Sequence, residues 1–245
     1  MTVLAVGIWL GVVGACDLLR AARDATTALR RGLIAAVGVL ALTLAGIVVE
    51  LSGSEWLWLF GGWVLSFLLW LGGSSAALQV HRTPARVVAF AGLALGLAVT
   101  LFGGGAIEPG LDWPARLEDA PLAQVPLDRF VLVSGVLLAQ LATVNVMVRL
   151  VLDAVGVPAT ANEKKLKGGR LLGPMERVFI VGLALAGEVT AAAIVVAAKG
   201  LLRFPELQRG ADTEGPSDVT EYFLVGSFAS WLCALGGVAL VHLAG

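Results

Sequence analysis

Glu188 stands in the middle of a long apolar run over residues 174–198, where we expect a membrane-crossing helix. Arg177 and Lys199 each lie eleven residues from it, and eleven residues at about 100° each return a helix to nearly the same face. These three residues would therefore share one stripe. Glu188 is either a cation-binding or proton-relay carboxylate, or a structural group that hydrogen-bonds a neighbouring helix.

A second polar stripe is expected on the apolar segment before it. Asn145, Arg149 and Asp153 are spaced i, i+4 and i+8, which places them on one helix face. They are candidates for a binding or relay site. Alternatively, Arg149 and Asp153 pair on the helix surface and reach the membrane interface, which needs no function.

A basic segment precedes the run that contains Glu188. Its cations are candidates for binding a phosphate-bearing ligand or an anionic lipid headgroup: Lys164, Lys165, Lys167 and Arg170. Pro174 follows and suits the first turn of a helix, whose free N–H groups favour anions. No Gly-Lys-Ser/Thr sequence follows, so the segment is not a P-loop. The alternative is an ordinary basic cytoplasmic loop.

Signatures of catalysis are missing from the sequence. The two histidines, His81 and His242, are far apart, and the two cysteines, Cys16 and Cys233, lie in or beside apolar segments. Neither pair has the spacing of a metal site. We therefore predict no metal, no cofactor and no catalytic residues. The net charge of −1 gives no sign of a nucleic-acid partner.

The elements that must position these residues are membrane-spanning. Of 245 residues, 58% are hydrophobic and 14% are charged, with a mean hydropathy of +0.89, far from the composition of soluble proteins. We predict an all-α polytopic integral membrane helix bundle that forms a single transmembrane domain. Its seven apolar segments, each expected to be a helix, cover residues 1–16, 32–51, 56–80, 87–104, 130–152, 174–198 and 221–244. The first is either a short retained helix or a signal peptide; no basic residue precedes it, which favours the helix.

The orientation follows from the basic residues on alternate loops. The first, third and fifth loops hold eleven Lys and Arg, and the second, fourth and sixth hold five. Because the side richer in Lys and Arg faces the cytoplasm, seven spans place the N-terminus outside and the C-terminus inside. We expect a multi-pass protein of the inner cell membrane, whose partners are the lipid bilayer and either a membrane protein or further copies of the chain.

Three stretches carry a resemblance to a known family. They read GRLLGPMER at 169–177, AAKGLLRF at 197–204 and EYFLVGSFAS at 221–230. In order and spacing they resemble the C-terminal part of the bacterial membrane-protein family named domain of unknown function 3307, although Gly200 stands where that family commonly has Ser. The family has no established reaction. The resemblance draws attention to Glu176, Arg177, Lys199, Arg203 and Glu221 as binding or relay candidates.

Three function classes follow. The first is transport or channel-like movement of a small solute, ion or proton through a path that includes Glu188. The second is a structural or sensory membrane subunit that binds a partner protein. The third, and the least supported, is a membrane enzyme acting on a phosphate-bearing lipid or nucleotide at the basic segment, because no paired carboxylates or metal ligands accompany those cations.

Overall fold

The computed structural model describes residues 2–20, 27–49, 55–80, 83–103, 113–114, 116–118, 120–157, 169–198, 201 and 218–244. Of these residues 91% are helical and none forms a strand, so the predicted all-α class is confirmed for them. By their contacts the residues divide into two units, which are Met1–Thr143 with Val241–Gly245, and Val144–Leu240.

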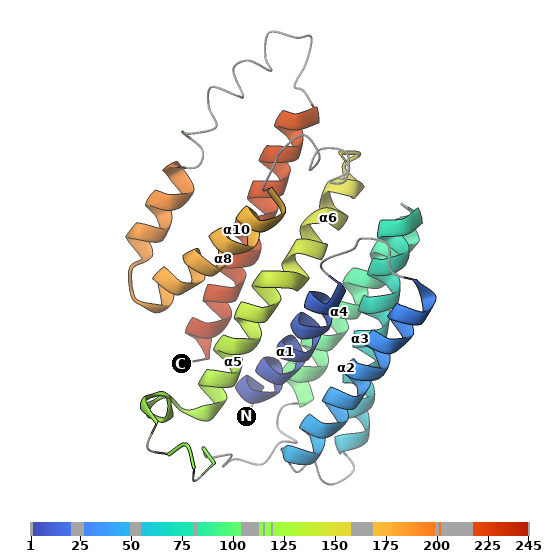
Figure 1. Cartoon of the computed structure of the whole chain (residues 1–245), viewed down its shortest axis with the longest axis vertical. Coiled ribbons are helices and arrows are strands. Elements are labelled where there is room, and N and C mark those ends of the chain that lie inside the picture. The colour runs from blue at the N-terminus through green and yellow to red at the C-terminus, as the bar shows by residue number, and fades with distance from the viewer. Residues whose placement is uncertain are drawn as a thin grey trace. The chain divides into compact units, whose positions relative to one another are not determined.

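The first unit is built from four long helices and the start of a fifth (Figure 1). The long helices are α1 (Thr2–Arg20), α2 (Ala28–Val48), α3 (Glu55–Val80) and α4 (Thr83–Gly103). A short 3-10 helix, η2 (Pro121–Gln124), precedes α5 (Leu127–Leu138), which continues into a π-helical turn, η3 (Ala139–Thr143). The most extensive contacts join α3 to α4 and α1 to α5.

Helix α1 is the most enclosed of the four long helices of this unit, because its glycines let another backbone come close. A β-carbon on Gly7 would lie 2.6 Å from the backbone nitrogen of Leu132 in α5, and one on Gly14 would lie 2.7 Å from the carbonyl carbon of Leu138. Such contacts between small residues hold helices together in lipid, where the hydrophobic effect between helices is absent. Trp9 and Val13 are fully buried. Residues 2–16 of the predicted segment 1–16 therefore belong to a helix that the unit is packed around.

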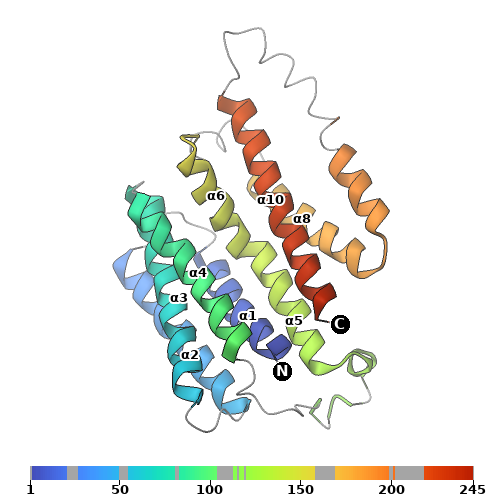
Figure 2. The ribbon, with the colours of Figure 1, turned by 180° about the vertical axis from the view of Figure 1, so that it is seen from behind.

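The second unit contains α6 (Val144–Ala154), α8 (Gly169–Leu185), the short helix Val189–Ala198 and most of α10 (Asp218–Leu243). Figure 2 shows α8 and α10 from behind. Ile180, Ala192 and Ala234 form a small buried core, one residue from each of the last three helices, with Leu183, Val196 and Trp231 packed against it. Small side chains at Ala192 and Ala234 allow the helices to approach closely.

Six described helices are long and apolar enough to cross a membrane: Thr2–Arg20, Ala28–Val48, Trp56–Val80, Thr83–Gly103, Leu127–Ala154 and Glu221–Leu243. The fifth is continuous through α5, η3 and α6. The chain is thus a multi-pass membrane protein, as predicted. These six helices correspond to predicted segments, with ends shifted by a few residues, whereas the predicted segment 174–198 corresponds to none of them.

The prediction of one helix over residues 174–198 is wrong. Helix α8 ends at Leu185, and Gly187 adopts a φ of +83°, a conformation that glycine reaches without a steric penalty. The N–H of Glu188 donates to the carbonyl of Leu183 (2.8 Å), and the N–H of Gly187 donates to that of Ala184 (3.1 Å). This pair of bonds is a Schellman motif, which ends a helix. The helix Val189–Ala198 then begins, so residues 169–198 form a helical hairpin, called the α8 hairpin below.

Candidate functional site

Among the described residues of the second unit, Arg177 is the most deeply buried charged side chain, with 1% of its surface exposed. Its Nη1 donates to Ser230 Oγ on α10 (2.9 Å), and its Nη2 donates to Asn145 Oδ1 on α6 (2.9 Å). A buried guanidinium is tolerated only when its N–H groups find acceptors. Arg177 therefore joins three helices, and the structure brings two predicted site residues, Arg177 and Asn145, into direct contact.

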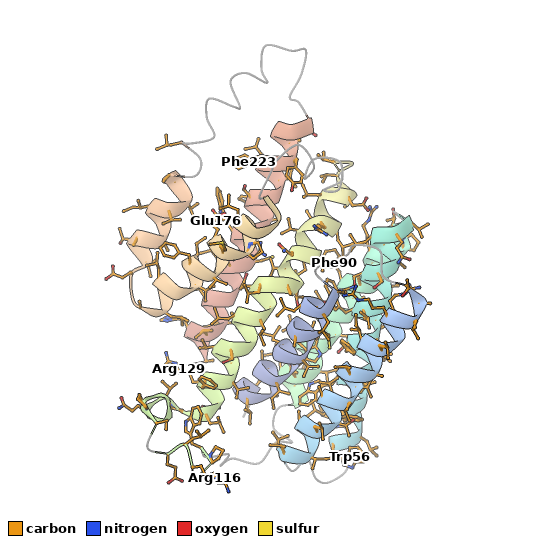
Figure 3. All side chains as sticks on the ribbon, in the orientation of Figure 1. Trp56, Phe90, Arg116, Arg129, Glu176 and Phe223 are labelled. Carbon is orange, nitrogen blue, oxygen red and sulfur yellow. The ribbon has the colours of Figure 1, made fainter. Side chains whose placement is uncertain are left out.

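Glu176 attaches the hairpin to α10 at a second point. Its half-buried side chain, labelled in Figure 3, accepts a hydrogen bond from Trp231 Nε1 (3.1 Å). Consecutive residues of α8 thus contact consecutive residues of α10: Glu176 contacts Trp231 and Arg177 contacts Ser230. The two contacts fix both the rotation and the height of α8 against α10.

The expectation that Pro174 opens this helix is wrong. Helix α8 begins at Gly169 and contains Pro174 in its interior. A proline has no N–H to donate and its ring crowds the preceding turn, which weakens a helix at that point. Nearby, a β-carbon on Gly173 would lie 3.4 Å from Arg177 Nη1, so the missing side chain at this position leaves room for the guanidinium.

Glu188 lies in the turn of the hairpin and its side chain is exposed. Its backbone carbonyl accepts from the N–H of Ala192 (3.1 Å), which makes Glu188 the capping residue of the helix Val189–Ala198. A carboxylate at this end of a helix is favoured by the helix dipole. The predicted stripe through Arg177, Glu188 and Lys199 does not form, because the chain turns between the first two residues.

The remaining candidates are dispersed or undescribed. Arg149 and Asp153 are half-buried on α6 and both interact with other groups, while Glu221 is exposed near the start of α10. The residues Lys164, Lys165, Lys167, Lys199 and Arg203 lie outside the described part of the chain, as does the side chain of Arg170. The basic anion site therefore stays a prediction.

A buried ion pair in the first unit was missing from the predicted candidates. Asp17 and Arg20, 1% and 6% exposed, are neighbours on α1. Arg20 Nε and Nη2 lie 2.8 and 2.6 Å from Asp17 Oδ1. Trp70 Nε1 on α3 donates to Asp17 Oδ2 (2.9 Å), and Arg20 Nη1 donates to Ser75 Oγ (3.1 Å). The guanidinium carbon also lies 5.7 Å from the centre of the Trp70 ring, within the range of a cation–π contact.

The sequence signal for this cluster is the i, i+3 spacing of Asp17 and Arg20 at the end of an apolar run. It is weak, because the same spacing suits an interfacial helix.

A second missed feature is the π-helical turn η3, which holds the buried side chains of Gln140 and Thr143. Single π-helical turns occur often at functional sites.

Among the described residues, no group of three or more His, Cys, Asp or Glu side chains is arranged to hold a metal ion.

Comparison with family models, with curated proteins and with solved structures finds no match to this chain. The resemblance to the domain of unknown function 3307 family stays a prediction.

Proposed function

We propose that the chain is a transport or channel-like membrane protein that moves a small solute, ion or proton past Glu188. The observation that carries the proposal is the interruption of an apolar segment at Gly187, with a carboxylate placed directly at the break. Interrupted helices bind solutes and ions in many transporters because the break exposes backbone groups and helix ends.

A helix break at membrane depth costs free energy unless the backbone groups that it exposes find hydrogen-bond partners. A helix start leaves N–H groups without intrahelical partners; at this turn, the carbonyl of Glu188 accepts the first helical bond, from Ala192. The N–H groups between them, from Val189 to Ala191, therefore need acceptors from elsewhere. Such backbone is tolerated at membrane depth only where it is covered by protein or lines a water-filled cavity. A hydrated path beside the hairpin satisfies this requirement.

The chemistry of Glu188 narrows the cargo. A carboxylate supplies oxygen ligands to a cation or a titratable site to a proton, and its cost in lipid is high without water or a counter-charge. A cation or proton therefore fits better than an anion. The bonds from Arg177 to Ser230 and Asn145 hold the middle of α8, which leaves the turn at Gly187 as the part of the hairpin that responds to a bound ion.

Purified protein in liposomes tests the proposal. We expect proton or monovalent-cation flux above that of empty liposomes, followed with a pH-sensitive dye under imposed Na⁺ or K⁺ gradients. Glu188→Gln should abolish this flux while the protein stays folded, because glutamine keeps the shape but neither titrates nor carries charge. Glu118→Gln is the control, since it removes an exposed carboxylate that is not among the candidate site residues and should leave the flux unchanged.

Two results would contradict this proposal. If wild-type liposomes show no flux for any of these ions, the transport function is wrong. A stoichiometric membrane-protein partner in native extracts would then favour the second class, a structural or sensory subunit. If Glu188→Gln conducts as well as wild type and as Glu118→Gln, transport stands but its path does not include Glu188. The proposed location is the inner cell membrane of a bacterium, with the N-terminus outside.

A further inference from the structure

Helices α6 and α10 of the second unit run in opposite directions. A β-carbon on Gly226 would lie 3.6 Å from Leu152 Cδ1 and 3.9 Å from Val148 Cγ1. Further along α10, Ser230 shares the guanidinium of Arg177 with Asn145. Later residues of α10 therefore lie next to earlier residues of α6. In Figures 1 and 2 the end of α6 and the start of α10 accordingly lie at the same end of this unit.

The antiparallel arrangement of α6 and α10 determines on which side of the membrane α10 begins. If the α8 hairpin crossed the bilayer once, α6 and α10 would be the fifth and seventh spans and would run in parallel. Because they are antiparallel, the chain must begin α10 on the side where α6 ends. The segment between them therefore returns to the side from which it left.

The lengths of the hairpin's two helices agree with this. Helix α8 has 17 residues, but its first nine include Arg170, Glu176 and Arg177. The uncharged part from residue 178 to 185 reaches only about 12 Å at about 1.5 Å per residue. The second helix, Val189–Ala198, has ten residues and reaches about 15 Å by the same rise. Neither crosses a hydrocarbon core of about 30 Å.

The distribution of basic residues gives independent support. With seven spans, Lys199, Arg203 and Arg209 belong to the minority side, which holds five Lys and Arg against eleven. If the hairpin returns, these three residues join the majority, so that fourteen stand against two. The second distribution follows the positive-inside rule far more closely.

We infer that residues 169–198 form a re-entrant hairpin that enters and leaves the membrane on the cytoplasmic side, so that six helices cross the bilayer and both termini lie outside. The C-terminus thus lies opposite to the side that seven spans require. Glu188, at the turn, is carried into the membrane while both ends of the hairpin stay at the cytoplasmic face. This topology does not depend on the proposed transport function.

Single introduced cysteines distinguish the two topologies. In the full chain, Glu108→Cys is outside and Lys165→Cys inside under either topology, so they serve as references. Ala211→Cys and Ala244→Cys exchange sides between the two. A membrane-impermeant maleimide is applied to intact spheroplasts and to permeabilised ones. The wild-type chain gives the background, since Cys16 is buried and Cys233 half-buried.

We expect Ala211→Cys to behave like Lys165→Cys, with labelling lost in intact spheroplasts, and Ala244→Cys to behave like Glu108→Cys. Labelling of Ala244→Cys only after permeabilisation, as for Lys165→Cys, would overturn the inference. A second measurement avoids internal substitutions: alkaline phosphatase fused after Gly245 should be active and a fluorescent protein fused there dark. Both measurements report topology alone, so failure of the liposome experiment leaves them unaffected.

Discussion

Each of the two units buries an arginine, but the surroundings of the two side chains differ. Arg20 neutralises Asp17 three residues away on the same helix, and Trp70 and Ser75 on α3 complete the network. Arg177 instead extends from α8 to neutral oxygens of Ser230 and Asn145 on two other helices. The first arrangement balances its charges within α1, whereas the second uses a cation to hold one helix in place.

This difference suggests how the units divide their tasks. Charges that are balanced within α1 stay balanced whatever the neighbouring helices do, which suits a fixed scaffold. The α8 hairpin is attached to α10 through Glu176 and Arg177 in the middle of α8 and through the small core around Ile180 and Ala192. Its turn at Gly187 is held by the local bonds of a helix end. We expect the hairpin to be the more easily displaced region.

The largest expected effect comes from breaking the ion pair in the first unit. Removing one partner of a buried pair costs about 3–5 kcal/mol, because the other charge is left uncompensated. Arg20→Met should therefore strongly lower the temperature at which half of the detergent-solubilised protein stays monodisperse. The double variant Asp17→Asn with Arg20→Met removes both charges and should recover part of the loss. A double variant less stable than Arg20→Met alone would show that the loss in Arg20→Met does not come from the uncompensated charge of Asp17.

A smaller loss is expected where α1 meets α5. Gly7→Ala places a β-carbon 2.6 Å from the backbone of Leu132, and overpacking of this kind costs about 1–3 kcal/mol. The control is Gly61→Ala on α3, where a β-carbon meets no atom within 4 Å and alanine should stabilise the helix slightly. The same thermal measurement checks both. Equal stability of the two variants would mean that α1 and α5 can separate without loss.

Much of the helical framework follows from the sequence alone. Six of the predicted apolar segments match helices such as α2, expected at residues 32–51 and found at Ala28–Val48. Hydropathy suffices for these because lipid leaves backbone groups no partner other than their own helix. It does not locate the turn at Gly187, since residues on both sides are apolar. The available signal is a glycine followed by an acidic residue, the pattern of a helix end next to a helix start.

The candidate site was predictable only in part. Arg177, Glu176 and Asn145 attract notice as polar groups in apolar segments, but their contacts to Ser230 and Trp231 depend on how α8 packs against α10. Asp17 and Arg20, in contrast, were not among the predicted candidates. By sequence they end a short apolar run and suit the interface, and only the position of α3 beside α1 reveals that Trp70 and Ser75 enclose them.

The smallest expected effect tests the attachment of the hairpin. Trp231→Phe keeps an aromatic ring at the small core of the second unit but removes the N–H that donates to Glu176. A hydrogen bond to a charged group contributes about 1.5–3 kcal/mol when buried, and the half-buried position of Glu176 should lower this to about 1 kcal/mol. We therefore expect hydrogen exchange to become faster in α8 and in the helix Val189–Ala198, with little change in α1 or α5. Trp56→Phe, at an exposed tryptophan of α3, should leave exchange in the hairpin unchanged. If Trp231→Phe accelerates exchange equally in both units, the hairpin is not an independently displaced element, and the contrast between the two units fails.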